Sequence, residues 1–251
     1  MKDPKTMACI NMHGILGCLV DLCKFNPQAR ELACGKPVTV SFVVRGGPSM
    51  TLSFDNGNCR AGPGDAPCNI RLPFSSSEKF NGMIDGTVTP FPSKGFTRLG
   101  FLTKNFTKMT KILEQYLRAS PEDLAKDDFF EASTVTMFHL IARSVSQIGN
   151  NDRIGRFSAS NIVDGTVLLS IGGTIQAAII VKDHIMTTSR EIPGHCHAVM
   201  EFADLALARD VFDGKVSTFG CVGKGLITMR GNLSMLDNIN RILDRVAFYL
   251  A

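Results

Sequence analysis

The chain repeats itself, and this repeat limits what it can fold into. The stretch CNIRLPFSSSEKFNGMIDG, at residues 68–86, and the stretch CHAVMEFADLALARDVFDG, at residues 196–214, have Cys, Phe, Asp and Gly at the same spacings. Three further blocks align when the sequence is shifted against itself by 126 to 130 residues. Self-similarity over this distance predicts two structural units of one kind rather than one large domain.

The aligned blocks predict the secondary structure of each unit. Apolar residues recur at helical spacing over residues 12–23 and 138–149. The β-rich stretches VTVSFVVRGGPSMTLSF and TVLLSIGGTIQAAIIV each surround a Gly-Gly pair, which predicts a hairpin. The Cys-to-Gly block predicts a strand, a short helix and an Asp-Gly turn. The last block aligns Lys94-Gly95 with Lys224-Gly225 and ends in an amphipathic helix.

These elements predict an α+β fold with two domains, at residues 1–120 and 121–251, of which 121–131 form a linker. We expect a mostly antiparallel sheet in each domain, covered on one face by helices. The strands of the second copy are apolar on both faces, which predicts that their outer face is covered. The domains are expected to pack as a pseudo-dimer, because fused copies can reuse the self-complementary surface of a homodimer.

The segment FGCVGKGLITMRGNLSMLDNINRIL resembles the C-terminal signature of the sterol carrier protein 2 family, in which a strand led by Gly-Lys, a second glycine and an amphipathic helix close the domain. VMEFADLALARDVFDGKV and SIGGTIQAAIIVKDH resemble the family's strand, short helix and turn, and its early hairpin. In the first copy the match is looser: the next glycine after Gly95 is Gly100, and Pro90 and Pro92 are extra. The resemblance covers nearly the whole chain as two tandem copies.

The resemblance implies a sheet packed against helices with an apolar tunnel between them, and non-catalytic binding and transfer of lipids such as fatty acyl chains or sterols. A tunnel of apolar side chains is sufficient for this, because burying an acyl chain releases about 0.8 kcal/mol per methylene. A chain with 17 Phe, 11 Met and no Trp suits a soft apolar interior. The candidate lining residues are Phe74, Met83, Phe91, Phe106 and Met109 in the first copy and Phe202, Phe212, Phe219, Met229, Leu236 and Ile239 in the second. Each of them could equally fill a core.

Charge argues against nucleic acid as a partner, because the net charge is only +4. The basic character belongs to residues 1–126, which have 16 Lys and Arg against 10 Asp and Glu. Lys104, Lys108 and Lys111 form a stripe on the predicted closing helix of the first copy. The stripe predicts transient contact with anionic membranes during lipid exchange, at about 1 kcal/mol per charge. The alternative is a solvated helix face.

Motifs of catalysis are absent from the sequence: it has no P-loop, no GxGxxG after a strand, no GxSxG and no HExxH. We therefore expect no enzyme activity and no cofactor. His195 and His197 share one face of a predicted strand, but no third ligand accompanies them, so no metal site is expected. The eight cysteines contain no CxxC and are expected to be reduced thiols.

The sequence has no clean signal peptide, and its apolar runs are shorter than the roughly 18 to 20 residues that span a bilayer. We therefore expect a soluble, cytoplasmic protein. Two other functions stay open beside the lipid carrier. One is a ligand-free structural or interaction module, and the other is a thiol- or metal-responsive protein that uses the cysteine-rich first half. A homo-oligomer is also an open alternative.

Overall fold

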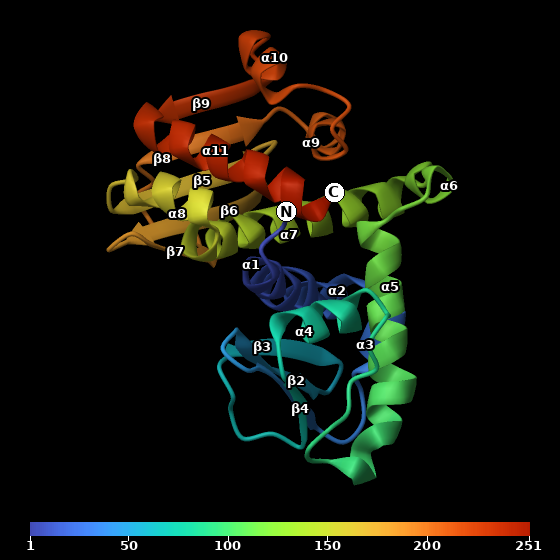
Figure 1. The fold of residues 1–251 in the computed structure, drawn as a ribbon. Helices are drawn as coiled ribbons and strands as arrows, with labels where there is room; N and C mark the ends of the chain where they lie inside the picture. Colours follow the sequence, from blue (N-terminus) through green and yellow to red (C-terminus); the bar gives the residue numbers. More distant parts are fainter. The chain divides into compact units, whose positions relative to one another are not determined.

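The computed structural model describes all 251 residues, apart from the side chain of Phe219 (Figure 1). By its internal contacts the chain divides into two compact units, which we call unit one (Met1–Ala132) and unit two (Ser133–Ala251). Each unit contains a sheet and helices, so the predicted α+β class with two sheet-plus-helix domains is confirmed. Residues 121–131, expected to be a linker, contain α6 (Pro121–Leu124) and the start of α7 (Asp127–Asn151).

Unit one has a four-stranded sheet in the order β3-β2-β1-β4. Its strands are β1 (Val38–Val44), β2 (Ser49–Asp55), β3 (Asn58–Pro63) and β4 (Ile70–Phe74). Its helical segments before α6 are α1 (Pro4–Cys9), the π-helix η1 (Ile10–Ile15), the 3₁₀ turn η2 (Leu16–Cys18), α2 (Leu19–Phe25), α3 (Pro27–Leu32), α4 (Ser77–Ile84), the 3₁₀ turn η3 (Phe96–Arg98), the π-helix η4 (Phe101–Phe106) and α5 (Thr107–Leu117). In Figure 1 the helices α1, α2 and α4 lie on one side of these strands.

Unit two has a five-stranded sheet in the order β7-β6-β5-β8-β9. Its strands are β5 (Gly165–Ile171), β6 (Ile175–Lys182), β7 (Ile185–Ser189), β8 (Ala198–Phe202) and β9 (Ile227–Gly231). Its helices beyond α7 are α8 (Arg153–Ser160), α9 (Leu205–Phe212), α10 (Thr218–Gly223) and α11 (Leu233–Leu250). Helices α8 and α11 pack against each other, and α11 contacts β8 and β9 (Figure 1).

The first four strands of the two sheets have the same order and the same directions. The hairpins predicted at the two Gly-Gly pairs are confirmed as β1–β2 and β5–β6. The sheets are mixed, because β1 pairs parallel with β4 and β5 pairs parallel with β8. In each unit the first strand is followed by its hairpin partner and then by a third strand, antiparallel to the second. A loop then returns the chain to the free edge of the first strand, where the fourth strand pairs with it. Each fourth strand is followed by the predicted short helix and Asp-Gly turn.

The core of unit one follows from the alternation in β1. Val38, Val40, Phe42 and Val44 are buried, as predicted for a sheet with one apolar face. The long helical stretch Pro4–Phe25 covers 22 residues, and Asp3 caps its start by accepting a hydrogen bond from the Thr6 amide at 2.7 Å. By length and composition this stretch could cross a membrane, which the sequence did not predict. Most of its apolar window, 78%, is buried in the structure, as in a core helix of a globular domain.

Gly95 and Gly231 occupy the same place in their sheets. Each lies beside the first residue of the fourth strand, and each has a positive φ, of +92° and +87°. A Cβ on Gly95 would lie 2.3 Å from the carbonyl oxygen of Asn69, and a Cβ on Gly231 would lie 2.3 Å from that of His197. Only glycine fits a backbone approach this close at such a φ.

This placement corrects the predicted alignment of Lys94-Gly95 with Lys224-Gly225. By strand pairing, Gly95 corresponds to Gly231, and Gly225 ends the turn that precedes β9. The chain between the Asp-Gly turn and this glycine is shorter in unit one than in unit two. Unit one therefore has an isolated bridge between Arg71 and Lys94 at the place where unit two has the strand β9.

We predict that Gly95→Ala and Gly231→Ala each lower the free energy of unfolding of their unit by about 3 kcal/mol, because the methyl group adds a backbone clash to the strain of a positive φ. The matched control is Gly225→Ala, which has φ +71° but no heavy atom within 4 Å of the added Cβ. Its expected loss is about 1 kcal/mol. Urea unfolding with peptide-resolved hydrogen exchange measures each unit, and equal losses for all three variants would contradict the close-approach explanation.

Candidate functional site

The lining residues predicted in unit one lie in different environments. Phe74, Phe106 and Met109 are buried, and Met83 on α4 is half-buried. Phe91 lies between α4 and η3 and is 77% exposed. Its neighbours are prolines, which hold the backbone of this connection extended and leave the ring on the surface. Phe91 is therefore not a lining residue of an interior site.

The lining residues predicted in unit two mostly face its core. Phe202 on β8 is buried, and so are Leu236 and Ile239 on α11. Phe212 and Met229 are half-buried. The side chain of Phe219 lies outside the part of the chain that the structure describes. The predicted residues of β8 and α11 are thus buried on two elements that contact each other.

Phenylalanine rings fill the interior of unit one. They come from both sides of the space between sheet and helices, and belong to Phe42, Phe54, Phe74, Phe80, Phe101 and Phe106. Neighbouring ring centroids are 5.1 to 6.5 Å apart, in tilted or edge-to-face pairs. These geometries are the favourable ones for aromatic packing. The rings form a continuous row where the resemblance predicts a tunnel.

The interior of unit two is mostly aliphatic and has fewer buried phenylalanine rings than that of unit one. Met186 on β7, Met200 on β8 and Met235 on α11 are almost fully buried. They pack among buried aliphatic residues of the sheet and of α11, which include Val167, Leu169, Ile179, Ile239 and Ile242. Unit one buries as many methionines, Met12, Met50 and Met109, so the two interiors differ in their aromatic rings and not in their methionine content. A core of flexible aliphatic and thioether side chains can change its packing more readily than a row of aromatic rings.

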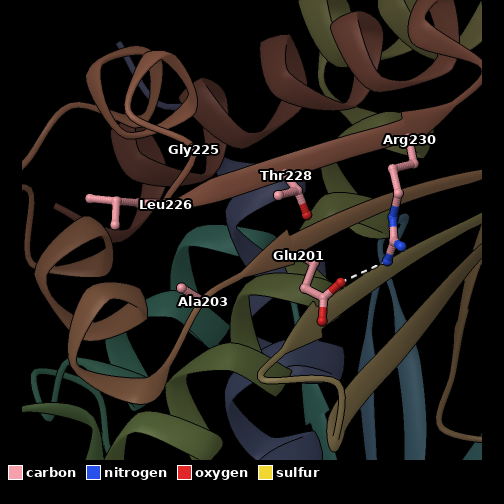
Figure 2. A pocket seen from close by; sticks show the side chains of 6 residues that line it. All are labelled: Glu201, Ala203, Gly225, Leu226, Thr228 and Arg230. Carbon is pink, nitrogen blue, oxygen red and sulfur yellow. Dashed lines mark hydrogen bonds and ion pairs between the residues drawn. The ribbon is translucent and has the colours of Figure 1, made fainter.

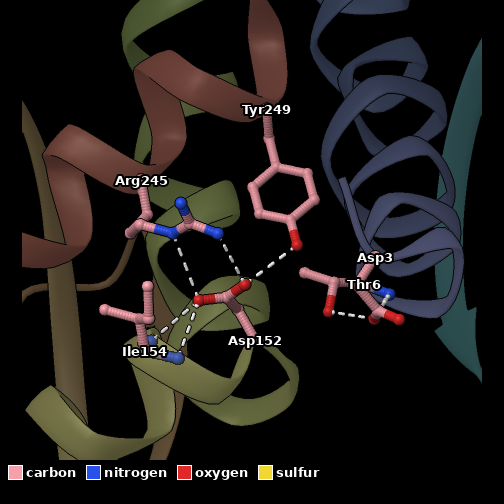
Figure 3. A network of polar contacts seen from close by, with 7 residues as sticks. Asp3, Thr6, Asp152, Ile154, Arg245 and Tyr249 are labelled. Atoms are coloured by element: carbon pink, nitrogen blue, oxygen red, sulfur yellow. Dashed lines mark hydrogen bonds and ion pairs between the residues drawn. The ribbon is translucent and has the colours of Figure 1, made fainter. Parts of the chain in front are cut away.

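A buried carboxylate ties the closing helix of unit two to α8 (Figure 3). Asp152 caps α8 by accepting hydrogen bonds from the amides of Ile154 and Gly155 at 3.0 and 2.9 Å. From α11, Arg245 donates to both carboxylate oxygens at 3.3 and 3.0 Å, and the Tyr249 hydroxyl donates at 2.9 Å. Burial acts to raise the pKa of Asp152, but these hydrogen bonds and the Arg245 charge outweigh it and lower the pKa.

Unit one has a neutral version of the same arrangement. Asn26 caps α3 by accepting a hydrogen bond from the Ala29 amide at 2.8 Å, and its side-chain nitrogen donates to the Tyr116 hydroxyl at 3.2 Å. Tyr116 lies on α5, the closing helix of unit one. The chain has two tyrosines, and each one bonds the capping residue of the helix that precedes the first strand of its unit. No local pattern in the sequence indicates this pairing, because the cap and the tyrosine are far apart along the chain.

A shallow pocket of about 290 Å³ opens beside β8 and β9 of unit two (Figure 2). Its lining residues are Glu201, Ala203, Gly225, Leu226, Thr228 and Arg230, none of which was predicted as a lipid contact. Glu201 and Arg230 form an ion pair across the two strands at 2.7 Å. The volume is at the lower limit of the roughly 300 to 1,000 Å³ of small-molecule sites, and the lining is partly charged. This pocket does not fit an acyl chain.

Two buried thiols of unit one are in contact, Cys23 on α2 and Cys59 on β3. The Cys59 thiol donates a hydrogen bond to the Cys23 sulfur and lowers the pKa of Cys23; burial opposes this, and the nearby Arg30 charge adds to it. The same hydrogen bond, with burial, raises the pKa of Cys59. Cys23 is thus the more acidic thiol of the pair.

The rings of His195 and His197 are in contact, with centroids 4.7 Å apart, and His197 Nδ1 accepts a hydrogen bond from the Thr166 amide. No cluster of three or more His, Cys, Asp or Glu in the described part of the chain is arranged to hold a metal ion. Lys104, Lys108 and Lys111 are exposed on η4 and α5, opposite the buried residues of that helix.

No protein-family model matches the chain, and no curated protein matches its sequence. Among solved structures it is similar to a UbiJ-SCP2 ubiquinone synthesis protein, with a TM-score of 0.33 and 10% identity, over 43% of this chain and 96% of that one. It is also similar to two structures of a sec-alkylsulfatase, one of them described as from Pseudomonas sp.. Their TM-scores are 0.27 and 0.25 at 10% identity, over 58% and 57% of this chain but 28% of the sulfatase. Likenesses this slight assign neither a family nor an activity.

We predict that Asp152→Asn lowers the free energy of unfolding of unit two by about 3 kcal/mol at pH 7, because it leaves the Arg245 guanidinium without its anionic partner. Since the pKa of Asp152 is lowered on folding, the wild-type contribution is complete above about pH 4 and is lost as the pH falls below that value. The matched change in unit one, Asn26→Ala, should cost about 1 kcal/mol. Hydrogen exchange of α11 at pH 7 and at pH 3 measures the free energy of unfolding in each variant. An equal loss in Asp152→Asn at both pH values would contradict a role for the ionised carboxylate.

We also predict that Cys59→Ala raises the pKa of Cys23, because the variant removes the hydrogen bond that stabilises the Cys23 thiolate. Cys59→Ser retains a hydroxyl donor and should raise the pKa less. Peptide-resolved alkylation rates of Cys23 across a pH series measure the pKa in each variant. An unchanged profile in Cys59→Ala would show that the hydrogen bond is not the cause.

Proposed function

We propose that the chain is a non-catalytic carrier that binds an apolar ligand, a fatty acyl chain or a sterol-like molecule, in the interior of unit two. In this proposal the two units are tandem copies of a sterol-carrier-like domain, and the second copy keeps the binding role. The segment that carries the family resemblance folds as α10, β9 and α11. The strand followed by a closing helix is the order that the resemblance implies, and α10 before the strand was not part of it.

The contrast between the two interiors carries the proposal. In unit two, α11 contacts β8, and the buried residues of these two elements include Met200, Phe202, Met235 and Ile239, a mostly aliphatic and thioether set that can change its packing for a ligand. About a dozen buried methylenes supply roughly 10 kcal/mol before ordering costs, which is enough for micromolar affinity after them. In unit one the row of phenylalanine rings occupies the corresponding space.

The pairing of tyrosine with a helix cap supports the tandem origin. The pairs Asn26–Tyr116 and Asp152–Tyr249 join the same two helices of each unit, by their order relative to the strands. Two such pairs, together with four strands of identical order and direction, are what duplication of one domain produces.

A second candidate is a ligand-free interaction module. It is favoured by the close packing of unit one, and by the pocket beside β8 and β9, whose lining includes none of the predicted lipid contacts. In this case the buried methionines of unit two only fill its core.

The first experiment is native purification, extraction with organic solvent and mass spectrometry of the extract, followed by titration with a fluorescent fatty acid. The proposal predicts a lipid recovered in stoichiometric amount. Ile239→Phe in unit two should reduce bound lipid at least tenfold, because it fills the interior with a larger side chain. Met109→Phe, at an equally buried position of α5, is the matched control and should leave binding unchanged. Circular dichroism checks that both variants fold.

An empty extract together with no binding of the fluorescent fatty acid would refute the carrier and leave the interaction module. Loss of binding in Met109→Phe but not in Ile239→Phe would place the ligand in unit one and refute the assignment to unit two.

A further inference from the structure

An exposed cluster of apolar side chains lies just before the closing helix of unit one. It consists of Phe91, Phe96 and Leu99, which are 77%, 54% and 37% exposed. The rings of Phe91 and Phe96 are in contact, with centroids 5.9 Å apart. Exposed apolar residues that gather in one place, rather than singly, mark interaction sites on soluble proteins.

The cluster belongs to a basic segment of the chain. The segment from residue 87 to 111, which contains the cluster, has five Lys and Arg and no Asp or Glu. Lys94 and Arg98 lie within the cluster's own stretch, and the exposed Lys104, Lys108 and Lys111 continue along η4 and α5. On the neighbouring elements, α3 carries the exposed Glu31 and β2 ends at the exposed Asp55. The segment as a whole presents positive charge.

The cluster is held in place by the fold. The amide of Ser93 donates to the Arg71 carbonyl at 2.9 Å, and the amide of Arg71 donates to the Lys94 carbonyl at 3.2 Å, so the segment is fastened to β4. Just beyond the cluster, Phe101 packs on Phe54 with ring centroids 5.2 Å apart. The exposed rings are thus presented by an anchored backbone, and docking does not have to order a free loop first.

We propose that Phe91, Phe96 and Leu99, with Lys94, Arg98 and the lysine stripe of η4 and α5, form a surface that docks on anionic lipid bilayers. The apolar side chains enter the boundary between headgroups and acyl chains, and the cations contact lipid phosphates and carboxylates. Phenylalanine and leucine flanked by Lys and Arg are the composition that binds this interface. Long basic side chains reach the headgroups while neighbouring apolar groups are buried. The inference does not depend on a bound lipid in unit two.

A second exposed ring provides a matched control. Phe157 on α8 of unit two is 67% exposed, close to the value for Phe96. The residues around it in the sequence, 152–164, contain two Asp and two Arg, so this stretch has no net charge. If exposed aromatic area alone caused membrane binding, the two positions would be equivalent.

The test is cosedimentation of the full chain with vesicles of phosphatidylcholine alone and of phosphatidylcholine with phosphatidylserine. We expect binding to the anionic vesicles that weakens with added salt, and at least tenfold weaker binding to the neutral ones. Phe91→Ser with Phe96→Ser should weaken binding to anionic vesicles at least tenfold, and Phe157→Ser should not change it. Replacing Lys104, Lys108 and Lys111 by Gln should weaken binding to anionic vesicles about fivefold for each lysine that contacts the membrane.

Two results would overturn the inference. One is the absence of binding to anionic vesicles. If the wild-type chain then forms a concentration-dependent dimer that Phe91→Ser with Phe96→Ser abolishes, the cluster is a contact between copies of the chain. The other is equal loss in Phe157→Ser and in the Phe91 and Phe96 variant, which would show unspecific adsorption. A chain that fails to bind fatty acid but binds anionic vesicles would refute the carrier and leave this inference standing.

Discussion

The closing helix of each unit depends on a polar contact with the cap of a helix far away in the sequence. In unit two, Arg245 and Tyr249 of α11 bind the carboxylate of Asp152. Asp152 precedes all five strands of the sheet in the sequence, whereas α11 follows them. Because a buried carboxylate without partners is strongly destabilising, the last turns of α11 have one favourable position against α8. Hydrophobic packing alone would permit sliding of α11 along the sheet, since burial of apolar area is not directional. The polar contact removes this freedom and fixes what lies between β8 and α11.

The two units use the same scheme with different chemistry. Unit one replaces the charged cluster by a neutral amide and a phenol, and its interior by aromatic rings. It also replaces a full fifth strand by one bridge at Lys94. In our proposals unit two holds the ligand and unit one supplies the surface that docks on a membrane, so the two tasks belong to different units.

Local patterns in the sequence predicted local structure well. The hairpins, the short helices with their Asp-Gly turns and the buried face of β1 followed from spacing, because each depends on residues close in sequence. The parallel pairs β1–β4 and β5–β8 did not follow, because alternation shows that a residue is in a strand but not which strand lies beside it.

Two of the three errors, those at Gly95 and Asp152, had the same origin. Gly95 was aligned with Gly225 because both follow a lysine, but its role comes from the carbonyl of Asn69, which no local pattern contains. Phe91 was counted as interior because phenylalanine usually is, although its proline neighbours already indicated an irregular segment. The partners of Asp152 were missed because the cap and the closing helix are distant in sequence.

The pairing of each tyrosine with a helix cap has a spectroscopic consequence. The chain has no tryptophan, so its ultraviolet emission comes from two phenols, one in each unit. The phenol of Tyr249 donates to a carboxylate and that of Tyr116 accepts from an amide, so the two fluorophores differ in their ground-state hydrogen bonding. The emission of each tyrosine therefore reports whether the closing helix of its unit is packed against the helix whose cap the tyrosine contacts. The protein therefore carries a built-in optical label for the closure of each half, and no dye has to be attached.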